Sequence, residues 1–227
     1  MEGSENKNRI EAFGEKENFS YGADSDIFKK KKKKGDMIAK EYYGLRKNFK
    51  PEEVKFILEN YYADTESAQQ LLEQNPNPLN QSLELDNKSI LKLDTQSIPI
   101  EYRVVPQGGM YLEDNEKHHQ YVVSQKKVDG INLEKLLYYK KHELDDQGVF
   151  TDSGVRQQLT DYSRKMFGYI NKCLDVHFIY DSSNIIPHFE DNKAVIYITD
   201  LAGRIGDYYQ LSPRIKKYRA EHNLHHL

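Results

Sequence analysis

The sequence predicts an α+β fold, because helical and strand-like patterns occupy separate stretches of its 227 residues. Segments 51–74 and 152–174 place apolar residues at the three- and four-residue spacing of amphipathic helices. Segments 98–105 and 185–200 contain strand-like apolar runs bounded by turn residues. A chain of this length forms one domain or two small lobes.

The chain begins with a polar segment, residues 1–16, which we expect to be disordered. Two strand-like pieces follow, Ile27-Phe28 and Met37-Ile38-Ala39, with six consecutive lysines, Lys29–Lys34, between them. Clustered lysines can neutralise the phosphates of nucleic acids. The position of this run between two strands and before Gly35-Asp36 favours an exposed hairpin turn instead.

Segment 51–74 carries the clearest helical pattern. Pro51 suits the first helical position, and Glu52 and Glu53 suit the first turn, where the helix dipole favours acids. The apolar stripe consists of residues at helical spacing: Val54, Ile57, Leu58, Tyr61, Thr65, Ala68, Leu71 and Leu72. Four glutamates repeat every seven residues on the polar face (Glu52, Glu59, Glu66 and Glu73), and Asp64 lies nearer the edge of the stripe.

A connector, residues 75–95, separates this helix from the next strands, although Ser89–Leu93 has a strand-like pattern. Segments 98–105 and 120–124 are predicted strands, with Gly108-Gly109 in the turn between them.

The second strong helix is predicted at 152–174, with Cys173 packed and inert on its apolar stripe. The stretch 212–226 indicates one amphipathic terminal helix. The histidines near the end of that helix are interpreted as solvated rather than metal-binding, because acids and cysteines at ligand spacing do not accompany them: His222, His225 and His226.

Segment 185–200 predicts a β-hairpin whose tip is the polar sequence FEDNK. Asn184 precedes the first strand and Asp200 follows the second, so the hairpin would bring them together at its open end. Mg²⁺ is usually held by one or two protein oxygens together with the phosphates of a nucleotide. We therefore predict that Asn184 and Asp200 hold Mg²⁺, although a plain hairpin with polar ends would also explain the pattern.

Composition excludes several classes of protein. The net charge of −3 predicts no general attraction to nucleic acid or to an anionic membrane. The single Cys173 excludes an intrachain disulfide framework and a cysteine-rich zinc module. No apolar stretch reaches the ~18 residues of a membrane span, and the N-terminus lacks an apolar signal region. We therefore expect a cytoplasmic protein.

The order of these features resembles the protein-kinase-like superfamily, including its aminoglycoside phosphotransferase branch. A glycine-containing turn at Gly22, a strand ending in Lys40, a long helix, Gly130, Asn184 and Asp200 follow one another as in that family. The stretch Val128–Leu133 looks like the linker between the two lobes of such kinases. The alternative for this stretch is a simple turn before a helix.

The resemblance implies ATP and Mg²⁺ as cofactors. Gly22 and Ser25 would cover the phosphates, and Lys40 would bind them. Glu59 has the most family-like separation from Lys40 among the acids of segment 51–74. Gln125 and Lys127, where the linker starts, would contact the nucleotide, while Asn184 and Asp200 would hold the metal.

Three departures from the family pattern affect the expected chemistry. Ile179 occupies the position of the catalytic-base Asp, so Asp181 is the candidate replacement, with Asp175 the other nearby acid. The metal-binding acid is followed by Leu201-Ala202 rather than by Phe-Gly. Only 27 residues follow Asp200, too few for the several helices that usually build the substrate platform.

These features predict a two-lobe kinase-like fold with a first lobe at 17–126, a reduced helical lobe at 127–227, and the metal hairpin 184–200 in the second lobe. The expected function is an atypical phosphotransferase that transfers a phosphoryl or nucleotidyl group from ATP to an unknown protein or small molecule. Asp181 and Lys40 are its expected catalytic residues. The alternative is a pseudokinase that acts as a protein-interaction module, with or without nucleotide.

Overall fold

The computed structural model describes the backbone of residues 16–21, 25–30, 37–42, 51–85, 97–115, 118–138, 152–202 and 205–222. Side chains are described within 53–85, 97–107, 125–138, 152–202 and 208–222. Several predicted features lie outside these residues: Gly22, the turn at 31–36, the strand at 89–93, and His225 and His226. The side chains of Ser25 and Lys40 are also outside the described set, as are residues 1–15.

The described segments confirm the α+β class. Five antiparallel strands form one sheet in the order β1-β2-β3-β7-β6. Their bounds are Lys16–Tyr21 for β1, Ser25–Lys30 for β2, Met37–Tyr42 for β3, Gln107–Asn115 for β6 and His118–Lys126 for β7. Strand β3 lies at the centre of this sheet, between β2 and β7.

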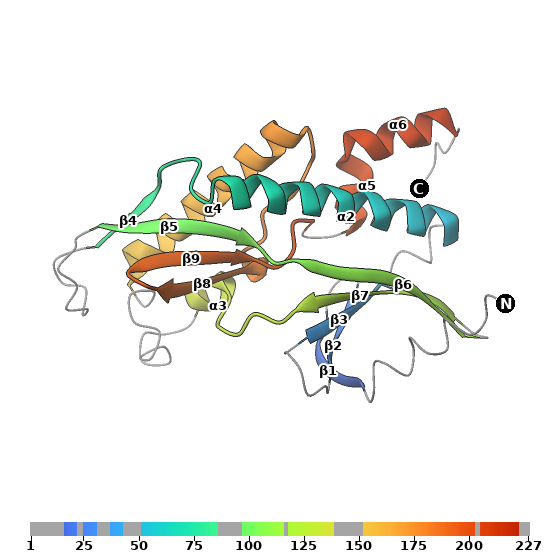
Figure 1. Cartoon of the computed structure of the whole chain (residues 1–227), viewed down its shortest axis with the longest axis horizontal. Coiled ribbons are helices and arrows are strands. Elements are labelled where there is room, and N and C mark those ends of the chain that lie inside the picture. The colour runs from blue at the N-terminus through green and yellow to red at the C-terminus, as the bar shows by residue number, and fades with distance from the viewer. Residues whose placement is uncertain are drawn as a thin grey trace.

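A second sheet has the order β4-β5-β9-β8, with β4 at Ser82–Glu84, β5 at Ser97–Val104, β8 at Ile185–Glu190 and β9 at Lys193–Ile198. Strands β5 and β9 are parallel, whereas the other two pairs are antiparallel. The chain runs from β5 through Val105 and Pro106 into β6 of the first sheet (Figure 1). One continuous segment thus links the two sheets, and the second sheet combines strands from both sides of residue 126.

The helices are α2 (Pro51–Gln74), α3 (Leu133–Tyr138), α4 (Ser153–Leu174), α5 (Ile205–Leu211) and α6 (Pro213–Glu221), with a short 3₁₀ turn, η4, at Ser182–Asn184. Helix α2 begins and ends where the sequence predicted. Helix α4 starts after Asp152, whose carboxylate accepts hydrogen bonds from the backbone N–H of Gly154 and of Val155. Among the described residues, no helix is both long and apolar enough to cross a membrane.

The core lies between the second sheet and helices α2 and α4, which run along it (Figure 1). Alternate residues of β5 face this core: Ile98, Ile100, Tyr102 and Val104. The stripe of α2 meets them with Ile57, Leu58, Tyr61, Ala68 and Leu72, and α4 contributes Leu159, Met166 and Ile170. The apolar stripe of α2 and the inward-facing residues of β5 therefore pack against each other.

Three expectations about individual segments were wrong. Gly108 and Gly109 lie inside strand β6, where the pairing with β7 shifts register between Gln107 and Met110, so the two glycines mark an irregularity rather than a turn. Cys173 is exposed, because the chain reverses after α4 and places Phe178 rather than Cys173 against the core. The terminal helix α6 is shorter than expected, and the separate helix α5 precedes it.

Candidate functional site

The hairpin formed by β8 and β9 has the predicted tip. Asp191 and Asn192 form a two-residue turn with φ of 48° and 61°. Two positive φ values in a two-residue hairpin connection match the twist of the flanking strands, and Asn and Asp tolerate this conformation well. The strands pair from Glu190 with Lys193 at the tip to Ile185 with Ile198 at the open end.

The open end of this hairpin brings Asn184 close to the segment that carries Asp200. The carbonyl oxygen of Asn184 accepts hydrogen bonds from Thr199 N–H at 2.9 Å and from Thr199 Oγ1 at 3.2 Å. Asp200 follows Thr199 directly. The predicted proximity of Asn184 and Asp200 in the hairpin is therefore present in the backbone.

The carboxylate of Asp200 is held by two donors that converge on the same oxygen. The hydroxyl of Tyr61, from α2, donates to Asp200 Oδ1, and Ala202 N–H donates to the same atom at 3.0 Å. The oxygen of Tyr61 in turn accepts a hydrogen bond from Leu201 N–H at 3.1 Å. The sequence pattern places Tyr61 only on the apolar stripe of the helix. Its polar atom on a buried stripe was the signal that it has a partner elsewhere in the fold.

Gln125 connects the first sheet to this site. It lies near the end of β7, is fully buried, and donates from Nε2 to the carbonyl oxygen of Thr199 at 2.7 Å. Its Oε1 has no hydrogen-bond partner within the described part of the chain. A buried amide oxygen of this kind is costly to leave unsatisfied, so it suits a site that receives a donor from a ligand.

The strand register places position 40 on the same face of the first sheet as Gln125. Gln125 pairs with Ile38, and Lys40 is two residues further along β3, where it pairs with Val123. Directly paired residues share a face of a sheet, as do residues two apart on one strand. Because Gln125 reaches toward Thr199, this face is the one that meets the open end of the hairpin. Ser25 occupies the first position of β2 and pairs with Tyr42.

The linker after β7 packs closely against the hairpin. Gly130 has φ of +129°, and a Cβ placed there would lie 2.7 Å from His188 Nε2 and 2.9 Å from Ile186 Cγ2. The position therefore requires glycine for both its conformation and its space. Asn132 donates from Nδ2 to the carbonyl oxygen of Ser183 at 3.0 Å, next to Asn184. Helix α3 begins at Leu133, which agrees with both interpretations of this stretch, the linker and the simple turn before a helix.

Lys127 and the acids of α2 have identifiable partners. The ammonium group of Lys127 pairs with Asp129. Glu59 lies 3.7 Å from Lys55 on the solvent-facing side of the helix, where half of its side-chain surface is exposed. Asp64 is buried and accepts a hydrogen bond from the Tyr208 hydroxyl at 2.6 Å, with Arg214 at 3.2 Å. Among the acids of α2 whose side chains the structure describes, only Asp64 is buried, and it faces the C-terminal helices.

The segment at the expected catalytic base lies beside Asp200. The backbone N–H of Ile179 donates to the carbonyl oxygen of Leu201 at 3.1 Å. Asp181 is the N-cap of η4, and its Oδ1 accepts a hydrogen bond from Ser183 N–H at 2.8 Å. The candidate base Asp181 therefore has a local structural role in the turn that leads to Asn184.

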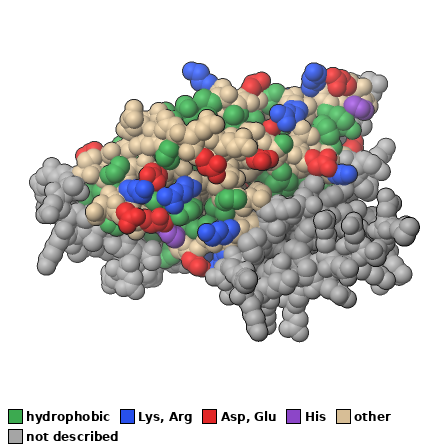
Figure 2. Space-filling view, in the orientation of Figure 1, with side chains coloured by type: hydrophobic (Ala, Val, Ile, Leu, Met, Phe, Trp, Pro, Cys, Tyr) green, Lys and Arg blue, Asp and Glu red, His purple; other side chains and the backbone are tan. Residues whose placement is uncertain are grey.

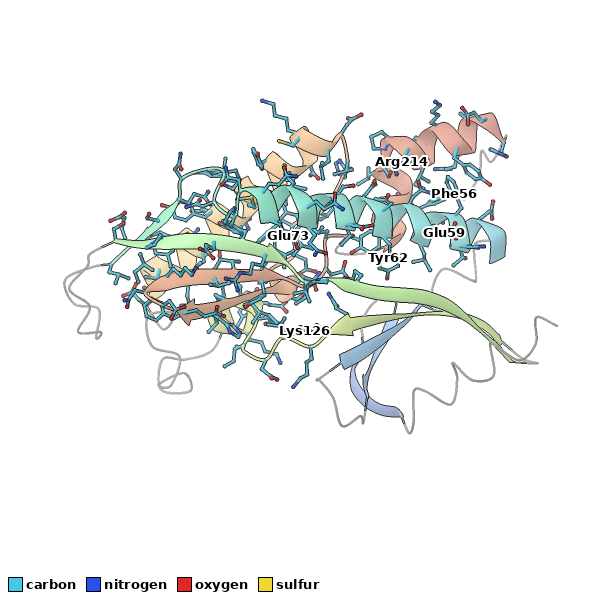
Figure 3. All side chains as sticks on the ribbon, viewed as in Figure 1. Phe56, Glu59, Tyr62, Glu73, Lys126 and Arg214 are labelled. Atoms are coloured by element: carbon cyan, nitrogen blue, oxygen red, sulfur yellow. The ribbon has the colours of Figure 1, made fainter. Side chains whose placement is uncertain are left out.

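A cavity of about 650 Å³ lies beside the linker, between the C-terminal turns of α2, strand β5 and the hairpin. Figure 3 labels Glu73 and Lys126, two of its lining residues. Arg103, in its wall, lies 3.2 Å from Glu101, 3.5 Å from Glu190 and 3.1 Å from the hydroxyl of Tyr197. Acidic and basic side chains are interspersed on the surface that Figure 2 shows. The hydrogen bond from Lys193 holds the pKa of Glu101 below its ordinary value.

The residues at the hairpin end fit a magnesium site of the type that shares its ion with a nucleotide. Carboxylate and amide oxygens are the ligands that Mg²⁺ prefers, and one or two protein ligands suffice when phosphates complete the coordination. Asn184 and Asp200 would provide that donor set, and hydrogen bonds from Tyr61 and Ala202 orient the carboxylate of Asp200. Within the described residues, no group of three or more His, Cys, Asp or Glu side chains forms a self-sufficient metal cluster.

No protein-family model matches the chain, and no curated protein matches it either. Among solved structures, the chain is similar to a double mutant of the PknI kinase domain of Mycobacterium tuberculosis, with a TM-score of 0.41 and 9% sequence identity. The alignment covers 85% of this chain and 62% of the PknI chain, so this chain spans less than two thirds of that structure.

Proposed function

We propose that this chain is a two-lobe, kinase-like protein that binds ATP with Mg²⁺ and transfers a phosphoryl or nucleotidyl group to a protein or small-molecule acceptor. The observation that carries the proposal is the convergence of Gln125, Asn184 and the anchored carboxylate of Asp200 at the end of one hairpin. The register of β3 adds Lys40 to the sheet face that meets this point. A cation at Lys40 on one side and metal ligands on the other would match the charge distribution of a bound nucleoside triphosphate.

The order of elements supports the same function. Strands β1 and β2 follow one another, and β3 carries Lys40 before the long helix α2. Strand β7 then leads through the linker to α3 and α4, and the hairpin β8–β9 follows. In the proposed arrangement the first sheet forms one lobe, and the second sheet with α2 and α4 forms the other. The nucleotide would lie between them.

Each residue then has a role in binding or positioning. Gly22, Ser25 and Lys40 would contact the phosphates, and Gln125 and Lys127 would contact the nucleotide near the linker. Asn184 and Asp200 would hold Mg²⁺, which neutralises charge on the phosphates. Asp181 would orient the hydroxyl of the acceptor.

A pseudokinase that binds nucleotide without transfer is the second candidate. Ile179 provides no carboxylate at the position of the base, and Asp181 already caps η4. Phosphoryl transfer depends mainly on positioning and electrostatic stabilisation, so an enzyme without the usual base is chemically consistent. Turnover of ATP by the parent protein, assayed with a panel of protein and small-molecule acceptors, separates the two candidates. Complete absence of turnover together with retained binding favours the pseudokinase.

The direct test of the site is the thermal stability of the protein with ATP and Mg²⁺. A ligand selective for the folded state at 100 times its Kd adds about 2.7 kcal/mol to the free energy of unfolding, so the melting temperature should rise by several degrees. Asp200→Ala should remove most of the Mg²⁺-dependent part of that rise. Asp161→Ala, on a partly exposed position of α4, is the control and should retain it.

A melting curve that saturating ATP and Mg²⁺ leave unmoved would show that the nucleotide site is absent. An equal Mg²⁺-dependent rise in the parent and in Asp200→Ala would retain nucleotide binding but remove Asp200 from the metal site.

A further inference from the structure

We infer that Tyr61 is the positioning residue of the metal-binding acid, so that helix α2 sets the orientation of the Asp200 carboxylate. This inference rests on the proposed function, because it specifies how the metal ligand of that site is held. The sequence separation of the two residues is 139, and the tertiary fold brings them together.

The hydroxyl of Tyr61 acts on Asp200 in two ways. As a donor it binds Oδ1 of the carboxylate, and as an acceptor it binds the N–H of the next residue, Leu201, at 3.1 Å. The first contact orients the side chain and the second fixes the backbone that carries it. Ala202 N–H reaches the same Oδ1 at 3.0 Å, which further restricts rotation of the carboxylate.

The ring that carries this hydroxyl is fixed by packing. Tyr61 is 1% exposed and makes edge-to-face contacts with Tyr62, Phe178 and Tyr208 at centroid distances of 5.3, 6.3 and 5.3 Å. Thr65 donates from Oγ1 to the backbone carbonyl of Tyr61 at 2.8 Å, one helical turn away. A side chain packed in this way moves with its helix, so the position of the hydroxyl follows the position of α2.

An oriented carboxylate has a direct consequence for metal binding. Binding a cation through a mobile side chain includes the entropy lost when that side chain is ordered. Here the hydrogen bonds with Tyr61 and Ala202 order the carboxylate before the cation arrives. Loss of the Tyr61 hydroxyl should therefore weaken the Mg²⁺-dependent part of nucleotide binding and leave the Mg²⁺-independent part nearly unchanged.

The chain offers a matched control for this test. Tyr208 is also a fully buried tyrosine of the same aromatic cluster, and it also donates to an aspartate, Asp64, at 2.6 Å. Tyr61→Phe and Tyr208→Phe thus remove the same chemical group from the same kind of environment. Only Tyr61→Phe removes it from Asp200.

The experiment compares the Kd of an unhydrolysable ATP analogue with and without Mg²⁺, by titration calorimetry, for the parent and both variants. The ratio of the two Kd values is the gain due to Mg²⁺. The Tyr61–Asp200 hydrogen bond exists with and without Mg²⁺, so only the cost of ordering the carboxylate differs between the two titrations. Tyr61→Phe should therefore reduce this gain by about three- to tenfold. Tyr208→Phe should keep the gain within about twofold of the parent. Urea unfolding should show that Tyr61→Phe and Tyr208→Phe lose comparable amounts of stability.

The outcomes separate the inference from the proposed function. A parent without any Mg²⁺-dependent gain would overturn the metal site and the inference together. A parent gain that Tyr61→Phe retains in full would overturn the inference alone, and Tyr61 would be a packing residue. Equal losses in the two variants would also overturn it, because the effect would then follow general stability.

A second measurement needs no variant. The amide N–H of Leu201 should exchange with solvent more slowly when the analogue and Mg²⁺ are both present than with the analogue alone. If Mg²⁺ does not change the exchange rate of the Leu201 amide, the hydrogen bonds of Tyr61 with Leu201 and Asp200 are not coupled to metal binding.

Discussion

Helix α2 takes part in two tyrosine–aspartate pairs with buried tyrosine rings, and the pairs differ in what surrounds the carboxylate. In one pair α2 provides the tyrosine, Tyr61, which binds Asp200. In the other α2 provides the aspartate, Asp64, which binds Tyr208 of α5. The two tyrosine rings are themselves in edge-to-face contact, so a single aromatic cluster supports both hydrogen bonds.

The carboxylate of Asp64 is enclosed and has a compensating cation. Asp64 is 3% exposed and lies 3.2 Å from Arg214 of α6. Burial raises the pKa of Asp64 above its ordinary value, while the Tyr208 hydrogen bond and the charge of Arg214 oppose that rise. Burial also raises the pKa of Tyr208, with the hydrogen bond to Asp64 acting in the same direction, so the proton stays on the tyrosine.

The carboxylate of Asp200 is only partly buried, and it lies next to the open end of a hairpin rather than between helices. One type of hydrogen bond therefore has two uses on the same helix. The Asp64 pair joins α2 to the C-terminal helices. Arg214, near the start of α6, is part of this contact (Figure 3). In the Asp200 pair the bond holds an acid at the point where we propose that a cation binds.

The largest effect should come from removing either of the two buried tyrosine rings. Tyr61→Ala and Tyr208→Ala should each lower the free energy of unfolding by ~3–5 kcal/mol, because each removes a fully buried aromatic ring and leaves a cavity. Urea unfolding followed by far-ultraviolet circular dichroism measures the loss. A loss below about 1 kcal/mol for either variant would contradict the placement of that ring in the common core.

The second prediction concerns the ion pair between Asp64 and Arg214. Arg214→Met should lower stability at pH 7 by roughly 1 kcal/mol, the range of partly exposed ion pairs. Arg214 lowers the pKa of Asp64, so it stabilises the folded protein only while Asp64 is ionised. The folded-state pKa of Asp64 lies above its ordinary value of 3.8. The difference between variant and parent should therefore vanish below about pH 3.8 and grow as the pH rises through the folded-state pKa.

Thermal unfolding of the parent and of Arg214→Met at pH 3 and pH 7 measures this difference. Other groups titrate in both proteins, so their contributions cancel in the difference in stability. A loss of equal size at the two pH values would show that Arg214 acts through packing of its side chain rather than through the charge of Asp64.

The smallest effect concerns the outer end of the interface between α2 and α6. Phe56 of α2 stacks on Tyr218 with ring centroids 3.8 Å apart and planes inclined by 23°. Figure 3 shows Phe56 and Arg214 where α6 runs along α2. Phe56→Leu keeps an apolar side chain but loses the stacking, and Phe56 is only partly buried, so stability should fall by about 0.5 kcal/mol. Nucleotide affinity measured alongside should match the parent, and a loss of affinity would link α6 to the site.

Elements that depend on local pattern were predictable. Helix α2 has the predicted bounds because its stripe, its N-terminal proline and its early acids all lie within one continuous segment. Helix α4 was predictable for the same reason, with Asp152 as its cap. The hairpin and the juxtaposition of Asn184 with the segment of Asp200 also follow from local pairing across a short turn.

Elements that depend on remote neighbours were not predictable from pattern. Gly108 and Gly109 indicate a turn in isolation, but pairing with β7 keeps them within a strand. The stripe of α4 extended in principle to Cys173, but the direction of the following chain decides what covers that last turn. The parallel pairing of β5 with β9 joins residues more than 90 positions apart, as in Ile100 with Ala194, and neither strand encodes its partner.

By itself, the sequence determined that this protein is α+β, where its two long helices lie, and that an asparagine and an aspartate meet at the open end of one hairpin. Periodicity, caps and turn residues act within a few residues of one another, so they are readable in the chain. The tertiary structure decided that Tyr61 holds Asp200 and that Asp64 faces Arg214 rather than the sheet. Those contacts depend on how α2 is rotated and packed between the hairpin and the C-terminal helices, and only the common core of all these elements fixes that rotation.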